Sequence, residues 1–254
     1  MSDTVTNPSG LPLFYQKPQP LASGIHGALR IKDGDYGFAA DTACIPLMLS
    51  EFAFAARDYP VLFAAQTMAP VALMGLQNQN LFVSDGAWDE DAYIPAYARR
   101  YPFSTLRLEE DKGFAMVLDV ASPRVTDSAD EGIALFEGDE PSAYTKQVLA
   151  FCEQFHADAL MTEAFSEALK AQDLLIERRA DIVLPDGEKL GVNGFLIIDP
   201  ERFSALDESI ITEWHRKGWL GIVHFHLASL ERFQNLVKRQ SRRPNSPNSQ
   251  DKAA

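Results

Sequence analysis

Three pairs of short apolar runs, each pair joined by a turn-forming or charged segment, constrain the fold more than any other feature of the sequence. The paired runs are 59–66 with 71–76, 103–108 with 114–120, and 181–184 with 192–198. Apolar runs of this length around a short connection predict β-hairpins. Because a hairpin pairs its two strands antiparallel, the pattern does not fit a regularly alternating βαβ fold with a parallel sheet.

Helical patterns lie between and after these hairpins. Residues 141–171 carry apolar side chains every three or four positions, which predicts one or two amphipathic helices. Similar spacing predicts helices over 45–57 and 203–217, and we expect a short helix over residues 91–100 that is interrupted by Pro95. Residues 219–238 are expected to form a strand that leads into a final amphipathic helix. The predicted fold class is therefore α+β, an antiparallel or mixed sheet built from hairpins with helices packed on it.

Composition divides the chain into three parts. Residues 1–24 are rich in Pro, Ser, Gly and Gln, which predicts a flexible N-terminal arm. Residues 25–238 carry apolar patterning throughout, and we expect them to fold as a single globular domain. Residues 239–254 are polar and basic, and we expect a disordered tail.

The chain is strongly acidic, with a formal net charge of -13. Residues 238–254 carry five basic side chains against one acidic one, so the remaining body is more negative than the whole chain. A body of this charge repels a phosphate backbone, and we therefore expect no nucleic-acid partner.

Cysteine usage and hydropathy both predict a cytoplasmic protein. Cys44 and Cys152 lie far apart in apolar surroundings, which predicts buried free thiols in a reducing compartment. The longest apolar stretch, 61–76, is interrupted by polar residues and by Pro70, so we expect no membrane span. The N-terminal residues lack the basic and apolar regions of a secretory signal.

His224 and His226 come nearest to a metal-binding pattern. On a strand the two imidazoles would point to the same side and could share a metal ion. On a helix they would diverge by roughly 200°. No obvious third ligand lies nearby, and the chain has no GxSxG, HExxH, GxGxxG or P-loop motif. We therefore predict no metal site, no cofactor and no catalytic residue, and name His224 and His226 as the residues to test for a metal.

Residues 93–103 carry the most binding-type chemistry. The segment contains three tyrosines, a phenylalanine and two arginines, and Tyr and Arg are enriched in binding hot spots. Arg99 and Arg100 can each donate paired hydrogen bonds to a carboxylate. Two interpretations remain open. Either Arg99, Arg100 and Tyr101 build a ligand site, or Tyr101 and Phe103 belong to the core while one arginine pairs with an internal acid.

Six short runs and one tryptophan along the chain carry a resemblance to a known family. They are FAADTACIPL (38–47), PVALMGL (70–76), NLFV (80–83), Trp88, YIPAYARRYPF (93–103), NGFLIID (193–199) and HLASL (226–230). In this order they resemble the SapC family of bacterial proteins, and the resemblance covers about residues 25–238. The ligand-binding residues that we predict within these runs are Arg99, Arg100, Tyr101, Tyr97, Trp88 and Asn80.

The resemblance implies an accessory role. The family is named for a component linked to surface-layer protein transport in Gram-negative bacteria, and its members accompany genes for outer-membrane receptors and flavin-dependent halogenase-like proteins. No catalytic residues are carried over from it. We expect a non-enzymatic binding or accessory protein in surface-layer or outer-membrane protein export or uptake, with envelope or secretion and transport proteins as partners. The alternative is an enzyme that acts on a small anionic or aromatic substrate near Arg99, Arg100 and Tyr101.

Overall fold

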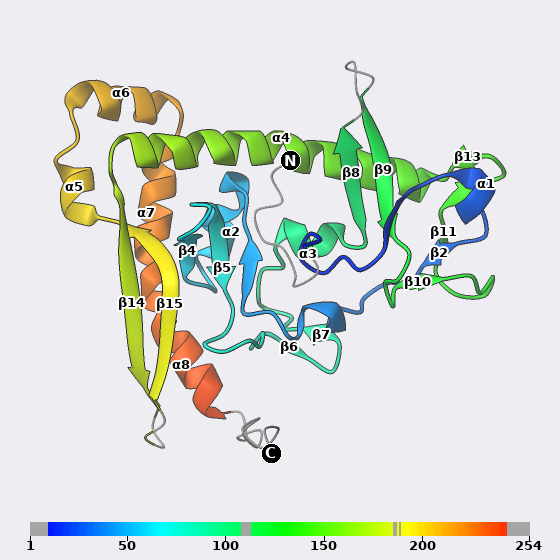
Figure 1. The fold of residues 1–254 in the computed structure, drawn as a ribbon, viewed down its shortest axis with the longest axis horizontal. Coiled ribbons are helices and arrows are strands. Elements are labelled where there is room, and N and C mark those ends of the chain that lie inside the picture. Colours follow the sequence, from blue (N-terminus) through cyan, green and yellow to red (C-terminus); the bar gives the residue numbers. More distant parts are fainter. Residues whose placement is uncertain (1–9, 108–112, 185–186, 188, 243–254) are drawn as a thin grey trace.

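The computed structural model describes residues 10–107, 113–184, 187 and 189–242 (Figure 1). The strands are β1 (Pro18–Pro20), β2 (Arg30–Ile31), β3 (Cys44–Pro46), β4 (Val61–Ala64), β5 (Pro70–Leu73), β6 (Val83–Ser84), β7 (Ala87–Trp88), β8 (Phe103–Arg107), β9 (Phe114–Asp119), β10 (Val125–Thr126), β11 (Ile133–Ala134), β12 (Phe136–Glu137), β13 (Glu140–Pro141), β14 (Leu175–Val183) and β15 (Lys189–Ile198). The α-helices are α1 (Ser23–His26), α2 (Phe52–Ala55), α3 (Ala96–Arg100), α4 (Ala143–Ala171), α5 (Pro200–Ser204), α6 (Glu208–Arg216), α7 (Trp219–Ser229) and α8 (Phe233–Arg242). Short 3-10 helices are η1 (Gly37–Ala39), η2 (Leu49–Glu51) and η4 (Leu230–Arg232).

All three predicted hairpins are present. The largest sheet has the strand order β14-β15-β4-β5-β3, and every neighbouring pair in it is antiparallel. Two hairpins, β4–β5 and β14–β15, supply four of its strands. The third hairpin, β8–β9, lies in a separate sheet with the order β1-β9-β8. Antiparallel sheets with helices packed on them confirm the α+β class.

The long helix α4 joins the two sheets. It begins at the cap residue Ser142, whose hydroxyl accepts a hydrogen bond from the Thr145 backbone N–H. It then runs 29 residues without a break and lies across both sheets (Figure 1). Its N-terminal half packs through Val148 and Cys152 on the smaller hydrophobic cluster, under β8 and β9. Its C-terminal half packs through Phe165 on the larger cluster, which fills the space around the five-stranded sheet.

The predicted flexible arm is wrong for residues 10–24, while residues 1–9 lie outside the described part. Phe14 and Tyr15 are buried, and β1 pairs with β9. The buried carboxylate of Asp119 accepts hydrogen bonds from the backbone N–H groups of Gln16 (3.0 Å) and Lys17 (2.7 Å). Residues 10–24 are therefore ordered although their composition is typical of a flexible segment. Two buried aromatic side chains and hydrogen bonds to one carboxylate attach them to the rest of the protein.

The C-terminal strand predicted within 219–238 is wrong, because this segment forms α7 and α8. Helix α7 packs against α2, β4 and β15, so most of its faces are apolar. A short apolar run of this kind has no period that separates a strand from a buried helix. Residues 239–242 of the predicted tail belong to α8, and 243–254 lie outside the described residues.

Two other helix predictions need correction in their details. The segment 45–57 begins within strand β3 and becomes helical only at η2 and α2, because Ile45 and Pro46 pair with β5. The segment 203–217 is divided into the end of α5 and α6, since Asp207 caps α6 by accepting a hydrogen bond from the Ser209 N–H. Among the described residues, no helix combines the length and the apolarity that a membrane span requires.

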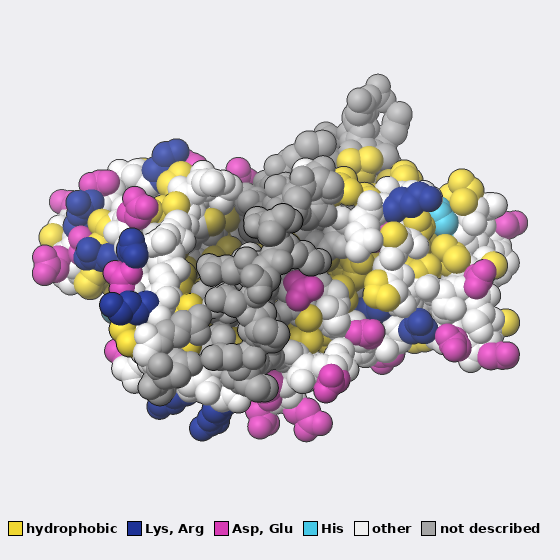
Figure 2. Space-filling model, turned by 60° about the horizontal axis from the view of Figure 1, so that its bottom comes forward, with side chains coloured by type: hydrophobic (Ala, Val, Ile, Leu, Met, Phe, Trp, Pro, Cys, Tyr) yellow, Lys and Arg dark blue, Asp and Glu magenta, His cyan; other side chains and the backbone are white. Residues whose placement is uncertain are grey.

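Charged side chains of both signs lie on the surface. In Figure 2 they are intermingled at the left-hand end of the face, where α5 and α6 lie in Figure 1. Some of them form ion pairs, for example Lys217 with Glu213 (2.6 Å) and Arg202 with Asp173 (2.6 Å). These pairs are exposed, so each contributes about 1 kcal/mol or less to stability.

Candidate functional site

A buried carboxylate fixes the short helix α3, which carries Arg99 and Arg100. Glu51 accepts hydrogen bonds from the first backbone N–H of α3, at Ala96 (2.6 Å), and from the Tyr93 hydroxyl (2.9 Å). Its other oxygen accepts from the Met48 N–H (2.8 Å). Burial raises the pKa of Glu51, and these donors together with Arg99 oppose the shift. Glu51 therefore ties η2 to the start of α3 and sets the direction in which α3 presents its arginines.

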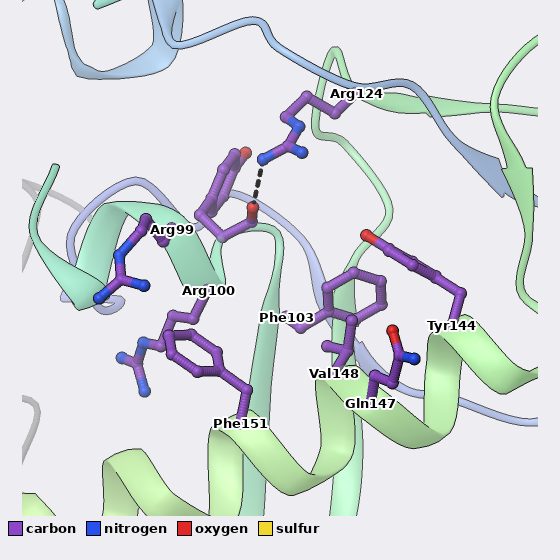
Figure 3. Close-up of a pocket in the computed structure, with 9 residues that line it drawn as sticks. Arg99, Arg100, Phe103, Arg124, Tyr144, Gln147, Val148 and Phe151 are labelled. Atoms are coloured by element: carbon purple, nitrogen blue, oxygen red, sulfur yellow. Dashed lines mark hydrogen bonds between the residues drawn. The ribbon is translucent and has the colours of Figure 1, made fainter.

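The two arginines open onto a pocket of about 230 Å³ between α3, β8 and α4. We call it the three-arginine pocket, after the three arginines among its lining residues. Its lining residues are Arg99, Arg100, Tyr101, Phe103, Arg124, Tyr144, Gln147, Val148 and Phe151. Figure 3 shows the last four of these rising from α4, with Arg124 on the opposite side of the pocket.

Arg99 is the exposed arginine of the pocket. Its Nε donates to the Ile94 carbonyl (3.0 Å) and its Nη2 donates to the Tyr93 hydroxyl (3.2 Å). Its guanidinium carbon lies 5.3 Å from the centre of the Phe151 ring and 5.7 Å from that of Tyr93. Two ring faces and two neutral acceptors therefore orient this cation, and the buried carboxylate of Glu51 interacts with it electrostatically.

Arg100 is buried, with 5% of its surface exposed. Its guanidinium carbon lies 4.2 Å from the centre of the Phe155 ring and 4.4 Å from that of Tyr97. A guanidinium is planar and less strongly hydrated than an ammonium, so it packs well between such rings. Tyr97 itself does not line the pocket; it is buried, and its hydroxyl donates to the Leu13 carbonyl (3.2 Å). Its role is to support Arg100.

Arg124 reaches the pocket from the loop after β9. It is 8% exposed, and it donates from Nη1 to the Tyr101 carbonyl (2.8 Å) and from Nε to the Lys32 carbonyl (3.2 Å). Both acceptors are neutral. Within the described part of the chain, no ion pair joins Arg124 or Arg99 to a carboxylate, and no acidic residue lines the pocket. The charged residues of the described lining are therefore all basic, on a protein whose overall charge is strongly negative.

The remaining wall of the pocket is apolar and aromatic. Tyr144, Val148 and Phe151 follow one another at spacings of four and three on α4, which puts them on one face of the helix. The Phe103 ring lies across from them, 6.2 Å from the Tyr144 ring. Burial raises the pKa of the Tyr144 hydroxyl, so this group stays protonated over the whole physiological range.

Tyr101 and Phe103 belong to the core, as the structural interpretation expected. They are 1% and 2% exposed, and the Tyr101 hydroxyl donates to Asp119 (3.0 Å). Burial raises the pKa of Tyr101 far above its usual value. Arg99 lines the pocket and donates to two neutral acceptors, and its role in ligand binding stays a prediction.

The other two predicted ligand residues lie away from the pocket. Trp88 is buried in the larger hydrophobic cluster, and its indole N–H donates to the Tyr59 hydroxyl (3.1 Å). Asn80 is fully buried, and its side-chain oxygen accepts from the Phe82 N–H (2.9 Å). Both side chains hold the loop around β6 in place.

The two histidines do not form a metal site. They lie on α7, where His224 is exposed and His226 is fully buried. Nε2 of His226 accepts from the Ile198 N–H (3.0 Å), whereas Nδ1 has no hydrogen bond. Burial lowers the pKa of His226 to about 4, and the Val61 backbone opposes part of this shift. No group of three metal-ligating side chains occurs in the part of the chain that the structure describes.

The sequence predicts the arginine wall of the pocket on α3 but not the other two walls. Arg124 lies in a loop whose sequence gives no binding signal, and only the fold brings it to α3. The α4 residues did give a signal, since Tyr144, Gln147, Val148 and Phe151 share one helix face. The spacing identifies this face of α4, but it does not show which element packs against the face.

One comparison with known proteins gives a match. A family model described as SapC matches residues 21–236, which includes the three-arginine pocket. No curated protein and no solved structure matches the chain.

Proposed function

Because the chain belongs to the SapC family, we propose that it is a non-enzymatic binding protein that holds a small organic anion in the three-arginine pocket. We further propose that it acts as a cytoplasmic accessory in the export or uptake of surface-layer or outer-membrane proteins. One observation carries the binding proposal: three arginines from two separate segments line one pocket, and no carboxylate lies among the described lining residues.

Electrostatics favours an anion at this place. Arginine side chains along the wall of a partly buried pocket attract an anion, and this attraction is weakly screened there. A bound anion gains charge-assisted hydrogen bonds, which arginine can donate in pairs. The aromatic side chains around the arginines exclude water and strengthen each of these bonds.

The chemistry of the lining supports binding rather than catalysis. Its described residues include no carboxylate, imidazole, thiol or amine that could act as base or nucleophile near neutral pH. The two tyrosines, Tyr101 and Tyr144, have pKa values raised by burial and are therefore poor bases and poor nucleophiles. An enzyme acting on a small anion near Arg99 would use the same pocket, and turnover of a bound anion would reveal it.

Calorimetric titration of the full chain with benzoate, phenyl phosphate and inorganic phosphate tests the binding proposal. We expect at least one of the two organic anions to bind, and Arg99→Gln to weaken it about tenfold or more, since a hydrogen bond to a charged group contributes about 1.5–3 kcal/mol. Arg99 is exposed, so this variant should fold. Arg216→Gln is the matched control, because Arg216 is exposed on α6. Absence of binding, or equal binding by both variants, contradicts the proposal.

The accessory role has its own test. The full chain, immobilised and incubated with lysate of its native host, should retain envelope or secretion proteins reproducibly. Retention of cytoplasmic enzymes alone would contradict this role while leaving the anion site intact.

A further inference from the structure

An exposed row of aromatic rings and one guanidinium leads up to the three-arginine pocket. It consists of Phe54, Tyr93, Arg99 and Phe151, and we call it the aromatic–arginine row. The Phe54 and Tyr93 rings are stacked with centres 5.6 Å apart and an interplanar angle of 20°. The Arg99 guanidinium then lies between the Tyr93 ring (5.7 Å) and the Phe151 ring (5.3 Å). Because Arg99 and Phe151 also line the pocket, the row and the pocket form one continuous surface.

The row is open to solvent where it begins. Phe54 is 53% exposed, Arg99 is exposed, and Tyr93 and Phe151 are half-buried. Single exposed hydrophobic side chains are common, but rings stacked with an arginine have the composition of interface hot spots. Such a surface is suited to apolar side chains of a partner that lies along it.

The charge pattern limits what the partner carries. The three arginines attract an anion into the pocket, whereas the protein as a whole has a formal net charge of -13. The net charge of the protein repels a polyanionic partner. The pattern therefore fits a partner with one negative group, which enters the pocket, followed by uncharged apolar groups.

An extended peptide with a free C-terminus has this arrangement of groups. We propose that the pocket and the aromatic–arginine row bind the C-terminal residues of a partner polypeptide. The α-carboxylate accepts hydrogen bonds from Arg99, and the apolar side chain of the last residue packs between Phe103 and Phe151. The preceding residues lie along Tyr93 and Phe54. Capture of a terminal carboxylate by positive groups, with neighbouring side chains read by apolar surface, is a known mode of peptide recognition.

A free aromatic acid carries the same carboxylate as a peptide C-terminus. The size of the ligand distinguishes the two. The pocket, at about 230 Å³, is smaller than sites for drug-sized ligands, so a single-ring acid would fill it. Such an acid would not reach Phe54, which is not part of the pocket lining. Only a longer ligand can contact the far end of the row.

The experiment uses the full chain and three probes. The first is a short fluorescein-labelled peptide of Gly and Ser that ends in two phenylalanines with a free carboxylate. The second is the same peptide with a C-terminal amide, and the third is N-acetylphenylalanine, used as a competitor. We expect the free acid to bind about tenfold or more tightly than the amide, from the loss of charge-assisted hydrogen bonds.

Variants then separate this inference from the proposed function on which it rests. Arg99→Gln should weaken the peptide acid and N-acetylphenylalanine alike, and Arg216→Gln should weaken neither. Phe54→Ala, at an exposed position, should weaken the peptide several-fold and leave N-acetylphenylalanine unchanged. If N-acetylphenylalanine binds through Arg99 but the peptide acid and amide bind equally, the anion site stands and the peptide inference is overturned. If neither acid responds to Arg99→Gln, both are overturned.

Discussion

The buried imidazole of His226 should make the folded protein sensitive to mild acid. In the unfolded chain a histidine takes up a proton near its usual pKa of 6.5, whereas burial keeps His226 neutral in the folded protein down to about 4. Between these values the unfolded state binds more protons, so stability is fully present above about pH 6.5 and falls as the pH decreases. Below the folded pKa the loss levels off. The full difference corresponds to about 3 kcal/mol, of which about 2 kcal/mol is lost by pH 5.

Urea unfolding followed by tryptophan fluorescence, near pH 7.5 and near pH 5, measures this loss directly. His226→Gln removes the titrating group, and it should reduce the pH dependence by about 2 kcal/mol relative to the wild type. His224→Gln is the matched control, since His224 lies on the same helix and is exposed. Glu51 and other groups also titrate, but they contribute equally to wild type and variant. A pH dependence that is the same in wild type and His226→Gln would refute the reasoning.

Three further predictions concern two buried carboxylates and the two cysteine thiols. Asp119→Ala should destabilise the protein by about 2–4 kcal/mol in urea unfolding, because it leaves two backbone N–H groups and a tyrosine hydroxyl without their acceptor; Asp119→Asn should cost less. Glu51→Ala should cost about 3 kcal/mol and should also weaken anion binding by releasing α3, whereas Arg57→Ala, at an exposed position nearby, should do neither. Burial raises the pKa values of Cys44 and Cys152 to about 11, so both thiols should react with Ellman's reagent at mildly alkaline pH much more slowly in the native protein than in urea. Rapid labelling of either native thiol would contradict this.

Local sequence patterns were enough for the hairpins and for α4. A hairpin is specified by two apolar runs and the turn between them, and a long amphipathic helix repeats its signal over many turns. The failures occur where tertiary packing decides. Helix α7 contacts other elements on several sides and so carries no period, and the segment before β1 is held by Asp119, which lies about one hundred residues away.

In the candidate site too, local sequence predicts some residues, and only tertiary packing brings in the others. The segment around Arg99 was recognised because its unusual residues are consecutive, although Tyr101 and Phe103 within it serve the core. Arg124 was not recognised, since an isolated arginine in a loop has no meaning until the chain brings it opposite α3. Asn80 and Trp88 were selected as neighbours in the family pattern, and the structure places them in packing roles.

The continuity of α4 has a consequence for cooperativity. One unbroken helix, α4, packs on both hydrophobic clusters. If the packing of one cluster is lost, part of α4 unfolds, and this weakens the packing of the other cluster. The two parts of the protein should therefore melt in a single transition. The three-arginine pocket lies against the N-terminal half of this shared helix, and an occupant that stabilises it there would raise the melting temperature of the whole molecule rather than of one half.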